Sequence, residues 1–169
     1  KIIIATKSEQ LRQFKLLKPL FPYLKCLYNA PLLRIYAKYP IHNDTKKAWF
    51  CDLPRITTNS FLRHIIPIDP NSGLIMISYT DGTDTNFFME DKTRQKLKKD
   101  ETIKNIIQTE LKEIFPNYNI PQPIYFKTHY WNVGAHHWKP NCNSKEIYKH
   151  VKNPMKNVYI IGEAFSQKQ

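Results

Sequence analysis

NVYIIGE, residues 157 to 163, is the stretch of sequence that decides the fold. Val158 to Ile161 is an apolar run that predicts a buried strand, and Gly162 directly after it predicts a tight turn. Glu163 to Ser166 is then expected to begin a helix. A strand, a glycine turn and a helix start in this order are typical of backbone that closely approaches a phosphate-bearing ligand.

A second short apolar strand, Ile2 to Ala5, lies at the other end of the sequence within KIIIAT. Both strands are short, apolar and bounded by turns, as parallel strands buried on both faces of a sheet are. We therefore expect the chain to leave one domain after residue 7, to build another over residues 8–155, and to return over residues 156–169. On this view both strands need a neighbouring sheet to cover their apolar faces.

The residues between these strands predict a mixed sheet with helices packed on it. The strongest helix is predicted over Asp100 to Phe115, where isoleucine and leucine repeat at helical spacing. The fold class is therefore α/β, with an α+β arrangement in the middle of the chain. Further helices are expected over Ser8–Leu17, Thr85–Leu97 and Ser144–Val151, and further strands over Pro31–Pro40, Trp49–Leu53, His64–Ile68 and Leu74–Tyr79.

The formal net charge of +12 leaves two explanations open. A strongly basic chain often binds an anionic partner such as nucleic acid. However, most of the 26 basic residues are lysine, and isoleucine and asparagine are also abundant, a bias typical of an AT-rich genome such as that of a large DNA virus or a protist. A solvated lysine surface explains the charge equally well, and no RGG tract, RNP-like pattern or zinc finger supports nucleic-acid binding.

Three cysteines, Cys26, Cys51 and Cys142, lie far apart without a CxxC pair. This odd number predicts free thiols in a reducing compartment. No apolar run approaches the length of a membrane span, and KIIIAT is too short for the apolar region of a signal peptide. We therefore expect no membrane association and an intracellular, cytoplasmic location, or a place in the virion if the protein is viral.

Two more stretches, NAPLLRIYAKYP (residues 29–40) and HYWNVGAHHWKP (residues 129–140), complete a family pattern with the two end strands. Over essentially all 169 residues the chain resembles the flavin-containing amine oxidoreductases, the group of monoamine oxidases, polyamine oxidases and flavin histone demethylases. The resemblance implies that residues 1–7 and 156–169 are strands of a Rossmann-like FAD domain. It implies that residues 8–155 form the substrate domain and that the remainder of the FAD domain is a partner of this segment.

The resemblance also implies which residues contact FAD. Ala135 stands where some relatives carry a flavin-linking cysteine, so the flavin is expected to be noncovalent. Trp131 lies closer to the glycine that follows it than the family spacing, which is a departure from the pattern. The cofactor-binding residues implied are Gly162, Glu163 and Ala164 for the chain of the cofactor, and Trp131, Gly134 and Ala135 for its ring.

His136 and Trp138 are implied to form the aromatic wall that admits the amine substrate. Aromatic walls suit amines because they hold the cationic form by cation–π attraction. A histidine where relatives have a tyrosine would make this wall polar and pH-sensitive. His136 and His137 are adjacent and point to opposite faces of a strand, with no carboxylate nearby in sequence, so we predict no metal site.

Arg34 is the candidate catalytic residue. It stands at the position from which a family lysine reaches toward the flavin through water. Arginine keeps its charge permanently, whereas lysine can shift its pKa and take part in proton or oxygen chemistry. This departure puts turnover with oxygen in doubt, and the alternative is that Arg34 is one surface residue of an alternating strand.

The sequence therefore predicts part of an FAD-dependent amine oxidoreductase, in which flavin accepts a hydride from a small amine and leaves an imine. The alternative is a redox-silent protein on the same scaffold, or a structural viral protein whose basic surface binds an acidic partner. Arg34, His136 and the spacing of Trp131 favour the alternative.

Overall fold

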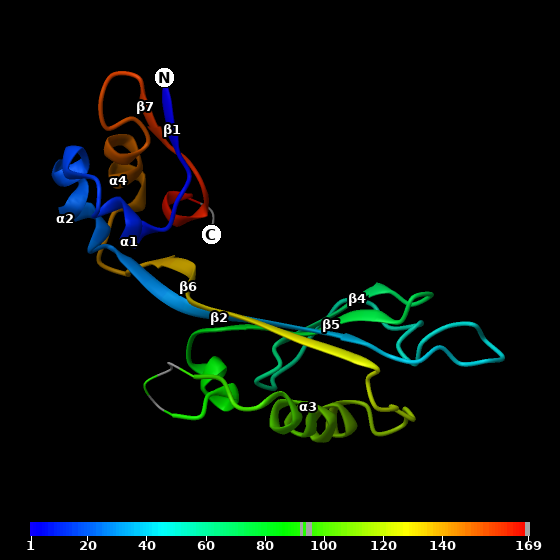
Figure 1. Ribbon diagram of the computed structural model, residues 1–169. Coiled ribbons are helices and arrows are strands. Elements are labelled where there is room, and N and C mark those ends of the chain that lie inside the picture. The colour runs from blue at the N-terminus through cyan, green and yellow to red at the C-terminus, as the bar shows by residue number, and fades with distance from the viewer. Residues whose placement is uncertain (92, 94–95, 168–169) are drawn as a thin grey trace. The chain divides into compact units, whose positions relative to one another are not determined.

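The computed structural model describes residues 1–91, 93 and 96–167, and it divides into two compact units (Figure 1). Unit 1 comprises Lys1–Ala30 and Val133–Gln169, and unit 2 comprises Pro31–Asn132. The predicted mixed α/β class is confirmed, with one antiparallel and one parallel sheet plus several helices. The units do not share the predicted boundaries at residues 7 and 156, and the functions assigned to those ranges stay predictions.

The two segments of unit 1 pair in a two-stranded parallel sheet of β1 (Ile2–Ile4) and β7 (Val158–Ile160). Ile2 lies opposite Val158 and Ile4 lies opposite Ile160. Both short strands that the sequence predicted are therefore present. Around them lie α1 (Ser8–Leu11), η1 (Lys15–Leu20), α2 (Phe21–Leu24), α4 (Ser144–Val151) and η3 (Glu163–Phe165).

A small apolar core holds unit 1 together. The amphipathic helix α4 contributes Ile147 and Val151, which are four residues apart and therefore lie on one face of the helix. Asn143 caps this helix, because its side-chain oxygen accepts the backbone N–H of Glu146. The other buried members of this core are Leu11, Leu17, Leu20, Leu24, Leu27, Ile160, Ala164 and Phe165.

A disulfide joins Cys26 to Cys142 within unit 1, so the prediction of free thiols was wrong for these two residues. The half-cystines are 116 residues apart with all of unit 2 between them, so their spacing did not indicate the pairing. The third cysteine, Cys51, is free and exposed. The disulfide covalently links the two segments of unit 1, near the points where the chain leaves this unit and re-enters it.

We expect reduction to destabilise unit 1, because the loop closed by the disulfide is long. Loop-closure entropy for a loop of this size corresponds to about 4–5 kcal/mol in the chain-entropy treatment. Cys142→Ser should lower the melting temperature as much as a phosphine reductant does, and the reductant should not lower it further. Cys51→Ser is the control and should melt like the unchanged protein; equal melting of all three proteins with and without reductant would contradict the disulfide.

Unit 2 is built on the five-stranded sheet, whose order is β3-β4-β5-β2-β6. The chain leaves unit 1 within β2 and returns to it within β6. The strands are β2 (Leu27–Lys38), β3 (Ile56–Thr57), β4 (His64–Asp69), β5 (Leu74–Asp81) and β6 (Tyr125–Trp138), and η2 (Gly82–Phe88) follows β5.

Helix α3 (Asp100–Ile114) lies along one face of this sheet (Figure 1). Its Ile103, Ile107 and Leu111 repeat at helical spacing and are buried in the core of unit 2. The sheet side of this core includes Leu33, Ile35, Ala37, Ile75 and Ile77, all of them fully buried. This alternation in β2 was predicted, and it leaves Arg34 and Tyr36 on the half-exposed face.

Three local predictions were wrong. The helix that begins at Ser8 ends at Leu11 rather than at Leu17, and Lys15–Leu20 forms the separate helical turn η1. Trp49–Leu53 forms turns rather than a strand, since Trp49 and Phe50 pack as an aromatic cluster. Thr85–Leu97 is not one helix: η2 ends at Phe88, and Met89 and Leu97 form an isolated bridge, while residues 92, 94 and 95 lie outside the described part.

In the described part of the chain, every helix is too short or too polar to cross a lipid bilayer.

The sheet of β1 and β7 has an exposed apolar side, where Ile3 and Tyr159 lie opposite each other. Open strand edges with exposed apolar side chains promote association. Ile3→Lys should therefore reduce light scattering at high protein concentration. Leu16→Lys is a matched control, because Leu16 is 68% exposed against 66% for Ile3 but lies outside the strands. If both variants reduced scattering equally, general charge rather than the strand edge would be responsible.

Candidate ligand-binding site after strand β7

Gly162 forms the turn that follows β7, with φ 111° and ψ 178°. This backbone conformation is strained for any residue with a side chain. A Cβ placed on Gly162 would meet nothing within 4 Å, so the space beside the turn is open. The short helical turn η3 begins directly after it, as the sequence predicted for a strand, turn and helix start. Backbone at this point is therefore accessible to a ligand.

An open hollow of about 400 Å³ lies beside this turn, entirely within unit 1. Because β1 and β7 are parallel, the residues that follow each strand meet at the same edge. Lys7 supplies the positive charge of the hollow and Glu163 the negative charge. Its lining consists of Ala5, Thr6, Lys7, His136, Ile161, Gly162, Glu163 and Ala164.

His136 and Glu163 form a close polar pair in the lining of this hollow. The Nδ1 atom of His136 lies 2.9 Å from a carboxylate oxygen of Glu163, and the backbone N–H of His136 donates to the other oxygen at 3.3 Å. An ionised carboxylate only accepts hydrogen bonds, so Nδ1 carries a proton in this pair. The pair fixes residue 136 of β6 against the turn after β7.

The remaining ring nitrogen of His136, Nε2, is buried without a hydrogen-bond partner among the described residues. The histidine is only 5% exposed. A buried polar atom without a partner is costly, and such atoms often mark a place where a ligand or water completes the hydrogen bonding. With the only ring proton on Nδ1, Nε2 would be free to accept a hydrogen bond from a ligand.

Trp138 is held by the core of unit 1. Its indole N–H donates to the backbone oxygen of Ser166 at 2.8 Å, and its ring lies 6.2 Å from that of Phe165. Gly134 and Ala135 are half-buried on β6, directly before His136. Neither they nor Trp138 line the hollow beside Gly162. Their predicted contacts with the flavin ring and the substrate stay predictions.

Arg34 and Trp131 lie in unit 2, where they contact each other. The guanidinium carbon of Arg34 is 4.8 Å from the ring centre of Tyr79 and 6.0 Å from that of Trp131. Burial by itself lowers the pKa of Arg34, but the hydroxyl groups of Tyr79 and Tyr36 outweigh it, so the pKa lies above its usual value. Its Nε atom is buried without a partner in the described part of the protein. The charge is therefore held permanently between aromatic rings.

Two groups of the predicted residues are thus brought together, each within its own unit. His136, Gly162, Glu163 and Ala164 share the hollow of unit 1, and Arg34 contacts Trp131 in unit 2. Sequence reasoning missed Lys7 and Thr6, which border the hollow from the end of β1. The parallel pairing of the two end strands was the signal that could have identified them, because it aligns their carboxyl ends.

Carboxylate and histidine side chains in this region do not gather as a metal site does. Across residues 1–91, 93 and 96–167, no group of three or more His, Cys, Asp or Glu side chains is placed to hold a metal ion.

No protein-family model matches the chain, and no curated protein sequence matches it significantly.

We expect Arg34→Lys to destabilise unit 2 by about 1 kcal/mol, because a lysine loses the planar contact with two aromatic rings. Urea unfolding measures this change. Arg12→Lys is the control, since Arg12 contacts one ring, that of Phe21, at 5.7 Å. Its effect should be smaller, and equal midpoints for both variants and the unchanged protein would mean that the rings do not stabilise Arg34.

Proposed function

We propose that the chain is part of an FAD-dependent amine oxidoreductase and that FAD binds noncovalently at the turn after β7. One observation carries this proposal: two parallel strands end at the same edge, where Gly162, with positive φ, borders an open hollow. Ligands of α/β proteins bind outside the carboxyl ends of parallel strands. The family resemblance of the sequence supplies the identity of the ligand.

The residues beside the hollow fit the polar part of a flavin nucleotide. Gly162 lets the backbone approach closely, as a nucleotide phosphate or ribityl group requires. Glu163 offers carboxylate oxygens that accept hydrogen bonds from hydroxyl groups, and Lys7 offers a cation for a phosphate. The hollow is open-sided and its volume of about 400 Å³ suits a portion of the cofactor rather than the whole.

When bound, FAD supplies the chemistry by accepting a hydride from the carbon next to the amine nitrogen. The protein itself orients the reactants and excludes water. Nε2 of His136 is suited to accept a hydrogen bond or a proton from a ligand, because Glu163 fixes the tautomer and orientation of the ring. No side chain of this site has to form a covalent bond.

A redox-silent scaffold is the second candidate, and the surroundings of Arg34 favour it. The arginine contacts the rings of Tyr79 and Trp131, and its permanent charge makes it unsuited to proton transfer. Such a protein would catalyse no redox reaction, whether or not it still bound flavin. Its basic surface would bind an acidic partner.

We expect Gly162→Ala to weaken FAD binding about tenfold, because a side chain at positive φ strains the turn and enters the hollow. Quenching of flavin fluorescence on titration of FAD with protein measures the affinity. Gly82→Ala is the matched control, since Gly82 also has positive φ and open space around its Cβ but lies in unit 2. Equal affinities of the two variants would contradict the assignment of this turn.

Acid precipitation of the flavin-loaded protein should release all the yellow colour, because Ala135 offers no atom for a covalent link. Flavin retained in the pellet would contradict noncovalent binding.

Anaerobic bleaching of the bound flavin by an amine separates the enzyme from the scaffold. If bleaching occurs, Arg34→Lys should accelerate reoxidation by oxygen more than reduction by the amine, since lysine can take part in oxygen chemistry. Stopped-flow absorbance measures both half-reactions. Flavin that binds but is bleached by no amine favours the scaffold.

A further inference from the structure

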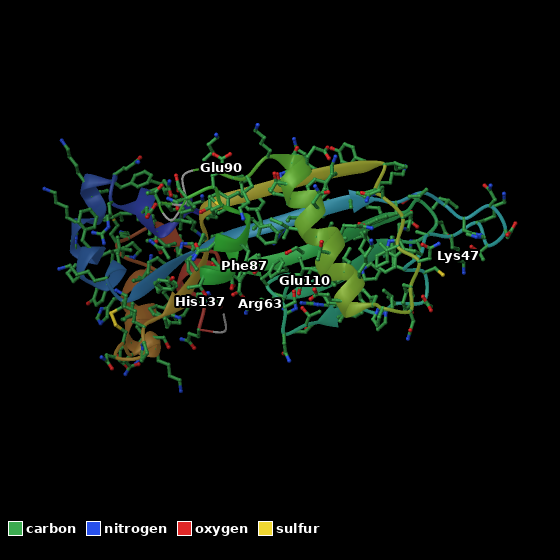
Figure 2. All side chains as sticks on the ribbon, turned by 90° about the horizontal axis from the view of Figure 1, so that it is seen from below. Lys47, Arg63, Phe87, Glu90, Glu110 and His137 are labelled. Atoms are coloured by element: carbon green, nitrogen blue, oxygen red, sulfur yellow. A yellow bond between two sulfur atoms is a disulfide. The ribbon has the colours of Figure 1, made fainter. Side chains whose placement is uncertain are left out.

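A hollow of unit 2 lies at the end of β2, and no ligand was predicted from the sequence for the residues that line it. Its volume is about 880 Å³. One wall is the segment after β2, which turns back at a hairpin tip that carries Lys47 (Figure 2), and the other is the segment after α3. All lining residues belong to unit 2. The hollow is thus independent of the proposed flavin site.

Two aromatic rings form the base of this hollow. Trp49 and Tyr118 are half-buried, with ring centres 6.0 Å apart and planes at 75°. Phe115 packs against both, at 5.7 Å from each, and is itself buried. The contacts with this third ring hold Trp49 and Tyr118 in place beside the hollow.

A carboxylate stands beside these rings. Tyr118 donates its hydroxyl hydrogen bond to Asp52 at 3.2 Å, which orients both the ring and the carboxylate. Partial burial and then the hydrogen bond to Asp52 raise the pKa of Tyr118, so its hydroxyl stays protonated and donates. An aromatic face next to an oriented carboxylate is an arrangement that attracts a cation.

The formal charges of the side chains that line the hollow have a negative sum when histidine is counted as neutral. Asp44 and Asp52 are acidic, and Lys47 is basic. His42 also lines the hollow; its Nδ1 lies 3.3 Å from the backbone nitrogen of Asp44 and 3.8 Å from a carboxylate oxygen of the same residue. On a chain with a net charge of +12, a hollow with more negative than positive charge is distinctive.

We propose that this hollow of unit 2 binds a small organic cation, with its ammonium group over the rings of Trp49 and Tyr118 and beside the carboxylate of Asp52. The rings contact the carbon groups attached to the nitrogen, and the carboxylate of Asp52 offsets its positive charge. Binding is weak, because the carboxylates are exposed and screened by water and salt. The site is separate from the proposed flavin chemistry and does not require it.

Choline tests this proposal, with 3,3-dimethylbutan-1-ol as its uncharged equivalent of the same shape. The side-chain N–H signal of Trp49 in a two-dimensional ¹⁵N spectrum is the reporter, and Trp49→Phe assigns it among the three tryptophan signals. Choline should shift this signal in a saturable way at millimolar concentration. The uncharged alcohol should bind at least about fivefold more weakly, the loss expected for one exposed cation–π contact.

Three variants locate the charge that is recognised. Asp52→Asn should weaken choline binding about fivefold, and Lys47→Gln should strengthen it about twofold, because they remove opposite charges from the rim. Glu113→Gln makes the same change of charge as Asp52→Asn on an exposed residue of α3 outside the hollow, and should leave the affinity unchanged. The same spectrum shows whether each variant is folded, so a variant that failed to fold would be recognised.

Three results would overturn the proposal. The first is the absence of any shift of the Trp49 signal with choline, and the second is equal binding of choline and the alcohol. The third is equal weakening by Asp52→Asn and Glu113→Gln, which would mean a general effect of net charge.

Discussion

Parallel pairing of β1 with β7 is the contact on which unit 1 depends. It joins residues that are more than one hundred and fifty positions apart in the sequence, with all of unit 2 between them. Without this pairing, the residues after the two strands would not meet, and Lys7 and Glu163 would not border one hollow. The disulfide between Cys26 and Cys142 joins the same two segments of unit 1, and both half-cystines pack against its core. The candidate ligand site is thus a consequence of bringing the two segments of unit 1 together.

Elements with a regular apolar pattern could be predicted from the sequence. Helix α3, helix α4 and the strand around Leu33 follow directly from spacing, because each buries one face against a core. Trp49–Leu53 could not be predicted, since its aromatic residues pack by tertiary contacts and leave no periodic signal. The disulfide was missed for a related reason: pairing of distant cysteines depends on the fold and not on their spacing.

Part of the candidate site was also accessible to sequence reasoning. The glycine after an apolar strand pointed to Gly162, because a turn at positive φ leaves few other choices. The partnership of His136 with Glu163 was not visible, since the two residues are 27 positions apart and lie on different elements. In the same way, the hollow of unit 2 arises from two loops whose residues have no common motif, so only the folded structure assembles Tyr118 with Asp52.

Hydrogen–deuterium exchange of the protein with and without FAD tests the central claim most directly, because it reports on each segment separately. If the turn after β7 binds the flavin nucleotide, FAD should slow the exchange of backbone amides in residues 5–7 and 161–164, which border the hollow of unit 1. Exchange in the hairpin that carries Lys47 should not change and provides the internal reference. Unaltered exchange in both end segments at saturating FAD, or protection found only in unit 2, would contradict the claim.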